Sequence, residues 1–485
     1  MKVFRSLFPA LLAVSLMAGN VFASHYDYLT DLSAEWIANP NRLATTSGAD
    51  AAVYNPAGTA FMNNGLYFNV SNQTILNFYS AEVASDYPGD FKESKSHKPS
   101  PVVPNVFLVY KQDDWSAFAM VNLITGTGSF NYANGLPSVN EKIRIAATSG
   151  LYGPLSAQLV DQVITAADFA GGTQPDLSDT TAATKIKNSR LLGTINCEVR
   201  GAGIAPAIGG AYKFNNMVAA SLSVRYLTSI KSSKATFVRG GKNGLDLNIL
   251  EAEMKATGIT PVVGLNIRPA DALNVGFSFE APTKLEYEID IKKDLSVDHI
   301  VSAAGGKPDG GKYRFDLPGK VNFGVEYAVT NDFKVMASGI YYLSKWMKME
   351  KFDSTGKKVD IDKKSHSYEI GAGFEWKFIQ NVAWTGGIVW DYINQPEENI
   401  SDELFKNNCL NVGTGFSIDA NDRTKFTIGF MRNFYPDLKR SNGAEAANGS
   451  FALVSGKPVP LTSKYDETYH KESWVVAVGM QYNFL

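Results

Sequence analysis

Histidine, the commonest catalytic base, gives the first indication of what chemistry this sequence can support. The five histidines stand far apart along the chain, and none lies in a recognisable catalytic arrangement: His25, His97, His299, His366 and His470. The sequence also contains no glycine-rich phosphate loop and no cluster of residues with metal-ligand spacing. We therefore expect a protein that is not an enzyme, with no catalytic residue, no metal site and no cofactor.

Residues 1–23 have the pattern of a secretory signal peptide. Lys2 and Arg5 precede an apolar stretch that runs from residue 7 to residue 17, and small residues lead up to Ser24. A buried N-terminal helix fits less well, because Pro9 interrupts the apolar run. The pattern therefore predicts export from the cytoplasm.

The two cysteines of the chain, Cys197 and Cys409, are candidates for one disulfide. Exported proteins meet oxidising compartments in which disulfides form and persist. Two free thiols are the alternative.

The composition excludes two classes of protein and favours β-structure. The 485 residues carry 46 basic and 48 acidic side chains, and a formal charge of −2 offers no basic surface for nucleic acid. Mean hydropathy is −0.12, and beyond residue 23 no apolar run approaches the ~18 residues of a membrane-spanning helix. The 42 glycines and 12% aromatic residues favour strands and tight turns over helices.

Fourteen segments beyond residue 65 place apolar side chains at every second position, which is the period of a strand with two different faces. The segment 366–378 shows this most clearly, because one face is aromatic and aliphatic while the other carries glycine and charged residues. The predicted strands are 66–80, 102–111, 115–126, 200–214, 217–231, 256–268, 272–292, 312–329, 332–350, 366–378, 381–394, 409–419, 424–435 and 472–485.

The connections between these segments indicate where the strands lie, since a soluble sandwich would also show alternation. Short connections of two to four residues alternate with long ones of 14 to 73 residues along the whole chain. Outer-membrane barrels have this asymmetry, with tight periplasmic turns, long external loops and an even number of strands. We therefore predict an all-β transmembrane fold: a 14-stranded antiparallel barrel in a Gram-negative-type outer membrane, with both termini in the periplasm.

The segment before the first strand, residues 24–64, lacks sustained period-2 character. It contains Asn55-Pro56-Ala57 shortly after Ala49-Asp50-Ala51. In this the chain resembles the FadL family of outer-membrane transporters for hydrophobic compounds, whose N-terminal hatch carries an Asn-Pro-Ala motif. Three further segments extend the likeness over essentially the whole mature chain: 209–216, 315–318 and 342–346.

The resemblance implies a barrel over residues 65–485 that is closed by a hatch formed by residues 24–64. It also implies passive uptake of long-chain fatty acids or aromatic hydrocarbons. In the family, a ligand is captured in an apolar groove among external loops, passes to a lumen site near the mature N-terminus, and leaves sideways at a kinked third strand. The expected partners are this hydrophobic ligand, outer-membrane lipids and lipopolysaccharide, and the barrel insertion machinery, with no nucleic acid, and we expect a monomer.

The third predicted strand, 115–126, is apolar on both faces. By the alternation of the strand, Phe118, Met120 and Ile124 should face the barrel lumen. Gly126 and Gly128 follow, and glycine permits a bend. We expect these five residues to line the lateral passage. The alternative is a strand packed against the hatch.

The longest connection, 127–199, contains apolar residues at helical spacing, among them Leu155, Leu159, Val163 and Ile164. An apolar helical face outside the membrane needs a partner, and we expect an external capture groove rather than mere loop packing. The family's large helical loop follows the fifth strand, whereas this one follows the third, so no groove residue is transferred from the family.

Arg225 lies in the lumen phase of its strand, because arginine on the lipid face would cost ~2–4 kcal/mol near the midplane. It could bind a ligand carboxylate. Pairing with an inward glutamate is the favoured alternative, and the candidates are Glu280, Glu326 and Glu369.

Two other functions remain open at this stage. A non-specific porin would have the same barrel and would admit small hydrophilic solutes. A surface adhesin would use the long external loops for binding.

Overall fold

The structure is a computed structural model that describes residues 30–85, 93–125, 129–132, 135, 194–239, 245–294, 309–352, 357–361, 367–393, 407–442, 451–454, 457–460 and 465–484. The predicted signal peptide and most of the 127–199 connection lie outside these residues. The same holds for Gly126 and Gly128 and for the four residues of the predicted capture groove, Leu155, Leu159, Val163 and Ile164.

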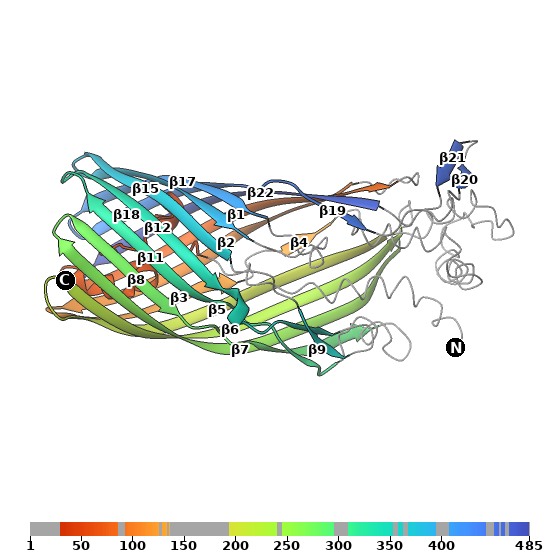
Figure 1. Cartoon of the computed structure of the whole chain (residues 1–485), viewed down its shortest axis with the longest axis horizontal. Coiled ribbons are helices and arrows are strands. Elements are labelled where there is room, and N and C mark those ends of the chain that lie inside the picture. Colours follow the sequence, from red (N-terminus) through yellow and green to blue (C-terminus); the bar gives the residue numbers. More distant parts are fainter. Residues whose placement is uncertain are drawn as a thin grey trace.

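Fourteen long antiparallel strands form a closed barrel, which confirms the predicted fold class (Figure 1). Each strand pairs with the next around the wall, and the last pairs with the first from Tyr67↔Asn483 to Ser85↔Tyr465. The strands are β1 (Gly65–Ser85), β2 (Glu93–Gln112), β3 (Trp115–Thr125), β5 (Thr194–Lys213), β6 (Val218–Arg239), β7 (Leu245–Ala270), β8 (Leu273–Glu280), β11 (Gly319–Ala328), β12 (Phe333–Leu343), β15 (Ser367–Ile379), β16 (Val382–Tyr392), β17 (Cys409–Asn421), β18 (Thr424–Phe434) and β22 (Tyr465–Asn483).

Shorter strands lie at the end of the barrel that carries the long connections. Four of them pair with barrel strands or with each other there: β4 (Ser129–Asn131) beside β5, β9 (Glu286–Asp294) between β7 and β10 (Lys312–Arg314), and β19 (Leu438–Asn442) beside β22. Two small hairpins are separate from the barrel sheet: β13 (Glu350–Phe352) with β14 (Lys358–Asp360), and β20 (Phe451–Val454) with β21 (Lys457–Pro460). Among the described residues, no helix is long and apolar enough to cross a membrane.

The strands present apolar side chains outward and polar side chains or glycine inward. In β15, Ile370 is 61% exposed on the outer face while Gly371 and Gly373 lie close to residues inside the barrel. In β11, Phe323 is 48% exposed and its neighbour Asn322 is 2% exposed. An outer apolar face is what a strand needs against lipid, and the alternation predicted from the sequence is therefore confirmed in these strands.

Three neighbouring strands break at one level of the wall, and there the predicted spans 272–292, 312–329 and 332–350 are wrong. β8 ends at Glu280 and β9 begins only at Glu286, with Pro282 between them. β10 ends at Arg314 and β11 begins after Pro318. The third break is η6 (Ser344–Trp346), a 3-10 turn that ends β12. Proline has no N–H to donate to a strand ladder, which explains the first two breaks.

At each break, the set of residues that faces the barrel interior shifts by one position along the chain. On the short-turn side of the breaks the buried residues have even numbers, such as Glu280, Asn322 and Ile340. On the long-connection side they have odd numbers, such as Leu285, Phe315 and Met347. In these strands the odd-numbered residues are the apolar ones. The shift therefore turns apolar side chains from the outside of the barrel to the inside.

Residues 30–64, which we call the N-terminal segment, fill the barrel interior. The helix α2 (Ala34–Ala38) contacts β1, β16, β17, β18 and β22. The 3-10 helix η3 (Pro56–Phe61) contacts the opposite wall, formed by β2, β3, β5, β6, β7 and β8, and α3 (Ala51–Tyr54) lies between the two. Contact with both walls of a closed barrel requires the segment to lie inside it.

Candidate binding site in the barrel interior

The Asn-Pro-Ala residues lie at the contact between the N-terminal segment and the wall. All three are buried, and Pro56 begins η3, where its fixed φ suits a first helical position. The Asn55 side-chain amide donates to the backbone oxygen of Thr45 at 2.9 Å and to Asn266 Oδ1 of β7 at 2.6 Å. The asparagine therefore joins two turns of the segment to the barrel.

A second set of contacts braces the segment internally. Arg42 forms an ion pair with Asp50 at 2.6 Å, and the Asp50 carboxylate also accepts from the Ser33 hydroxyl at 3.2 Å. The rings of Trp36 and Tyr54 stack with centroids 4.5 Å apart. These bonds connect α2 to α3 across the barrel.

Glycines on the inner wall let the backbone of the segment approach the strands directly. A Cβ on Gly413 would lie 2.5 Å from the backbone oxygen of Ile37, and one on Gly429 would lie 2.8 Å from that of Ala34. Gly276 and Gly324 face the backbone of Leu43 more closely still. Any larger residue at these positions would displace the segment.

The carboxyl group of Glu35 in the segment is buried against polar wall residues. Glu35 Oε1 accepts from Asn69 of β1 at 3.0 Å and from Thr427 of β18 at 3.1 Å. Burial, with a smaller contribution from the nearby carboxyl of Glu369, raises the pKa of the Asp31 carboxyl from its ordinary value of 3.8 to about 7. The contact between the segment and the wall is thus polar and contains titratable groups.

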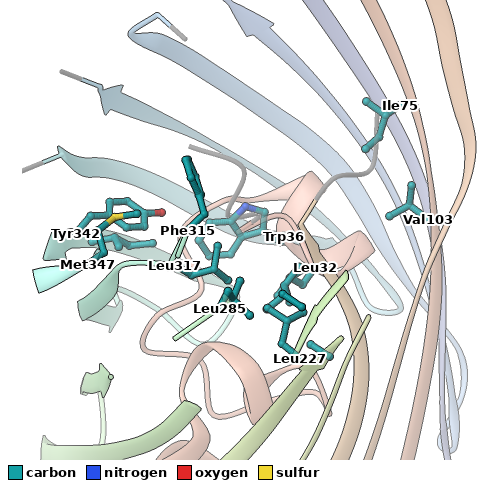
Figure 2. Packing of buried hydrophobic residues seen from close by; sticks show 14 of the residues in the cluster. Leu32, Trp36, Ile75, Val103, Leu227, Leu285, Phe315, Leu317, Tyr342 and Met347 are labelled. Atoms are coloured by element: carbon teal, nitrogen blue, oxygen red, sulfur yellow. The ribbon is translucent and has the colours of Figure 1, made fainter. Parts of the chain in front are cut away.

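An apolar cluster covers the segment on the side of the long connections (Figure 2). Its floor comes from the segment itself, through Leu32 and Trp36. Its walls include residues at the breaks between β8 and β9 and between β10 and β11, where Leu285 is 0% exposed and Phe315 and Leu317 are 3% exposed. The remaining members that Figure 2 labels are Ile75, Val103, Leu227, Tyr342 and Met347.

Charge near this cluster is mostly neutralised within the protein. Arg225 lies 2.7 Å from Glu280, and Lys320 lies 3.0 Å from the same carboxylate, with all three side chains at most 7% exposed. The favoured alternative from the sequence, pairing of Arg225 with an inward glutamate, is therefore what the structure shows. The Arg225 guanidinium already binds a carboxylate of the protein.

The wall is incompletely paired between β2 and β3. These strands pair only from Val106↔Val121 to Gln112↔Trp115, whereas β3 and β5 pair as far as Thr125↔Gly203. Among the described residues, no part of β2 on the long-connection side of Val106 pairs with β3. That stretch contains prolines, which cannot donate to a ladder: Pro99, Pro101 and Pro104.

The apolar cluster reaches this incompletely paired part of the wall between β2 and β3, which we call the seam. Val103 of β2 is 2% exposed and Ile124 of β3 is 1% exposed, and both belong to the cluster. Where the pairing ends, the side chain of Asn122 donates to that of Asn105 at 3.0 Å. An apolar surface thus runs from the barrel interior to the level at which the β2–β3 pairing ends.

The predicted passage residues separate into two groups. Phe118 and Met120 face inward and pack against Ala49 and Ala52 of the N-terminal segment, which is the alternative that the sequence left open. Ile124 lies in the apolar cluster at the seam.

The predicted disulfide is not formed. Cys409 is a free, buried thiol whose Sγ donates to Asn411 Oδ1 at 3.2 Å. Cys197 lies in β5, which pairs with β3, β4 and β6, whereas Cys409 belongs to β17 between β16 and β18.

Sequence reasoning missed the cluster residues between 281 and 318. An unbroken strand would place Leu285 and Phe315 toward lipid, and only the breaks turn them inward. Pro282 and Pro318 were the available signal, since proline within a strand pattern argues against a continuous ladder.

No protein-family model matches the sequence, and neither does any curated protein sequence. Solved structures do match the fold. A FadL homologue from Pseudomonas aeruginosa is 14% identical over 95% of this chain and 100% of its own, with a TM-score of 0.62. The Pseudomonas putida toluene transporter TodX is 13% identical over 95% and 100% of the two chains, with a TM-score of 0.55, and the Ralstonia pickettii toluene transporter TbuX is 13% identical over 90% and 94%, with a TM-score of 0.52. At these identities the likeness shows a shared fold, and it confirms the FadL-like fold predicted from the sequence.

Proposed function

We propose that this chain, which has the fold of FadL-type barrels, carries hydrophobic small molecules passively across the bacterial outer membrane. The candidate ligands are long-chain fatty acids and aromatic hydrocarbons, and the proteins of known structure with this fold include transporters of toluene. The observation that carries the proposal is the apolar cluster inside the barrel, where a porin would have a polar, water-filled lumen.

The N-terminal segment acts as a hatch in this proposal. Its hydrogen bonds to β1, β7 and β18 and its close approach to the wall glycines leave it fixed inside the barrel. Hydrophilic solutes would then be excluded from diffusion through the lumen. The hatch would comprise residues 24–64.

The ligand would leave through the seam between β2 and β3. A hydrophobic molecule gains nothing from release into water and is better delivered to the bilayer. Val103 and Ile124 would line this passage, and Gly126 and Gly128 would provide the bend in the wall. Capture outside the membrane by Leu155, Leu159, Val163 and Ile164 remains a prediction from the sequence.

The proposal also fixes how the chain lies in the membrane. A signal peptide of residues 1–23 and the barrel insertion machinery would deliver it, with both termini in the periplasm. Lipopolysaccharide and phospholipid would contact the outer apolar face, and the barrel would act as a monomer.

Transport assays separate this function from that of a porin. Cells or vesicles that contain the full chain should take up labelled fatty acid or toluene, while proteoliposomes should not swell with small sugars. Swelling without hydrophobic uptake would show a porin. Binding of the long loops to a surface ligand, with neither activity, would show an adhesin.

A second assay tests the route. Leucine at Gly126 and Gly128 should slow hydrophobic uptake several-fold while ligand binding to the purified protein stays unchanged. Leucine at Gly339, where the nearest atom to a new Cβ is 3.8 Å away, serves as the control. Unchanged uptake in the Gly126 and Gly128 variants would defeat lateral release at this strand.

A further inference from the structure

A single buried carboxylate lies where the three neighbouring strands break. Asp316 stands between β10 and β11, two residues before Pro318, and it is 2% exposed. The residues on either side of it, Phe315 and Leu317, belong to the apolar cluster. Asp316 therefore lies at the level of the breaks, next to residues that form the candidate binding site.

The Asp316 carboxylate accepts hydrogen bonds from the backbone of both neighbouring segments. Its Oδ1 accepts from the backbone N–H of Leu285 at 3.1 Å, and its Oδ2 accepts from that of Lys348 at 2.9 Å. Leu285 lies in the break between β8 and β9, and Lys348 follows the 3-10 turn η6 that ends β12. One side chain thus joins all three breaks.

The two carboxylate oxygens take the place of backbone acceptors. In a regular hydrogen-bonded pair of antiparallel strands, two residues exchange both of their N–H···O bonds. Here one bond of each exchange is a backbone bond, since the N–H of Phe315 donates to the oxygen of Leu285 at 2.9 Å and that of Asp316 donates to the oxygen of Lys348 at 3.0 Å. The N–H that would complete each exchange donates to the Asp316 carboxylate instead. A buried N–H without an acceptor is costly, so the carboxylate stabilises the broken arrangement.

Arg314 holds the carboxylate in this position. Its Nε donates to Asp316 Oδ1 at 2.8 Å, and one of its terminal nitrogens donates to Oδ2 at 2.5 Å. Two parallel bonds between a guanidinium and a carboxylate fix the orientation of both groups. Each oxygen of Asp316 therefore accepts one bond from the backbone of a neighbouring segment and one from Arg314.

We propose that Asp316 is the positioning residue of the interior ligand site, because it holds the three breaks together and thereby keeps Leu285 and Phe315 turned inward. This inference rests on the proposed transport function. Without the carboxylate, the broken arrangement loses two backbone acceptors relative to a continuous strand, in which odd-numbered residues face outward. Aspartate suits this role since both of its oxygens accept, whereas asparagine has one acceptor and sets its amide N–H groups against a backbone N–H.

The first measurement follows the direction of Phe315 without any ligand. The full chain in lipid nanodiscs carries para-fluorophenylalanine at position 315 or, as the outward reference, at position 323. Fluorine NMR relaxation is then measured with a paramagnetic lipid and with a water-soluble paramagnetic chelate. In the otherwise unchanged chain, the buried fluorine at position 315 should be shielded from both reagents, while that at position 323 should respond to the lipid.

The variant Asp316→Asn should expose the fluorine at position 315 to at least one reagent, with several-fold faster paramagnetic relaxation. Asp290→Asn is the matched control, because it removes an exposed carboxylate that pairs with Lys292 in β9. This control should leave position 315 shielded.

The second measurement is equilibrium binding of labelled hexadecanoate and of toluene to the same proteins. Asp316→Asn should weaken both ligands about 10-fold or more, as loss of hydrogen bonds to a charged group does, and Asp290→Asn should leave both unchanged. Should Asp316→Asn fail to give a folded barrel, Arg314→Gln replaces it. This variant loosens the carboxylate but retains its backbone bonds, so it should weaken both ligands about two- to fivefold and change the fluorine relaxation in the same direction.

Three results would overturn the inference. A shielded fluorine together with unchanged affinity would show no role for Asp316, and an exposed fluorine with unchanged affinity would show that the site does not depend on this arrangement. Loss of affinity with the fluorine still shielded would show that Asp316 acts in another way. Failure of the wild-type protein to bind either ligand would instead reject the proposed function, while the fluorine measurement would still decide whether Asp316 turns Phe315 inward.

Discussion

The barrel interior has two regions that the same strands build in opposite ways. On the short-turn side of Pro318, β11 faces inward with Lys320, Asn322 and Gly324, and the N-terminal segment packs there through hydrogen bonds and backbone contact. On the other side of the same proline, Phe315 and Leu317 face inward and form an apolar surface. Side-chain direction in a strand has a period of two, so a shift of one residue exchanges the two faces.

These two regions show how a membrane barrel can form an apolar interior site from the same apolar strand positions that elsewhere face lipid. The strands already carry an apolar face for contact with lipid. Where three neighbouring strands break at one level, that face turns inward, and the polar region next to it holds the N-terminal segment.

The largest loss of stability should come from removing the carboxylate that Arg225 and Lys320 share in the polar region. Glu280→Gln leaves Arg225 and Lys320 buried with no carboxylate between them and should lower the free energy of unfolding by about 3–5 kcal/mol. Unfolding in urea after reconstitution measures this. The matched control is Glu288→Gln, whose partner Lys312 lies 3.1 Å away in an exposed pair, and its loss should be about 0–1 kcal/mol. Equal losses in both variants would mean that the interior charges are hydrated.

A substitution on either side of Pro318 tests the phase shift itself. Phe315→Asn should weaken binding of a hydrophobic ligand about 10- to 100-fold, since burial of one phenylalanine contributes about 1.5–3 kcal/mol. Phe323→Asn, on the outer face of β11 beyond the break, should leave affinity unchanged while it destabilises the inserted barrel. Equilibrium binding to the purified variants gives the result, and loss of affinity only in Phe323→Asn would reverse our assignment of the two faces.

A smaller but distinct effect is expected where the N-terminal segment meets the wall. Gly324→Val would collide with the backbone of Leu43 and displace the segment, so proteoliposomes should begin to swell with small sugars. Gly339→Val, in the adjacent strand, should leave them impermeable, because its Cβ would make only an ordinary contact with the backbone oxygen of Glu369 at 3.8 Å. Impermeable liposomes with a folded Gly324→Val barrel would argue against a hatch at this position.

A pH dependence of the free energy of unfolding should arise from Asp31. Its pKa is raised to about 7 in the folded protein, so its contribution to stability is fully present below about pH 4 and is lost as the pH rises to about 7. Asp31→Asn should remove this part of the pH dependence of unfolding. Identical pH profiles for the variant and the wild type would show that Asp31 titrates normally.

The sequence alone predicted the barrel, its strand number and the phase of most strands, because lipid on one face imposes a strict alternation. Phe118, Met120 and Arg225 were assigned to the correct face for the same reason. The interior site could not be predicted in this way, since it exists only where the alternation fails.

The breaks in three neighbouring strands should create a ligand site inside the barrel. The most direct test is a crystal structure of the full chain grown with a brominated hydrophobic ligand, such as bromobenzene or a brominated fatty acid, with data collected at the bromine edge. We predict an anomalous peak among Leu285, Phe315 and Leu317, above the N-terminal segment. Bromine only on the lipid-facing surface, with ordered water throughout the lumen, would contradict it.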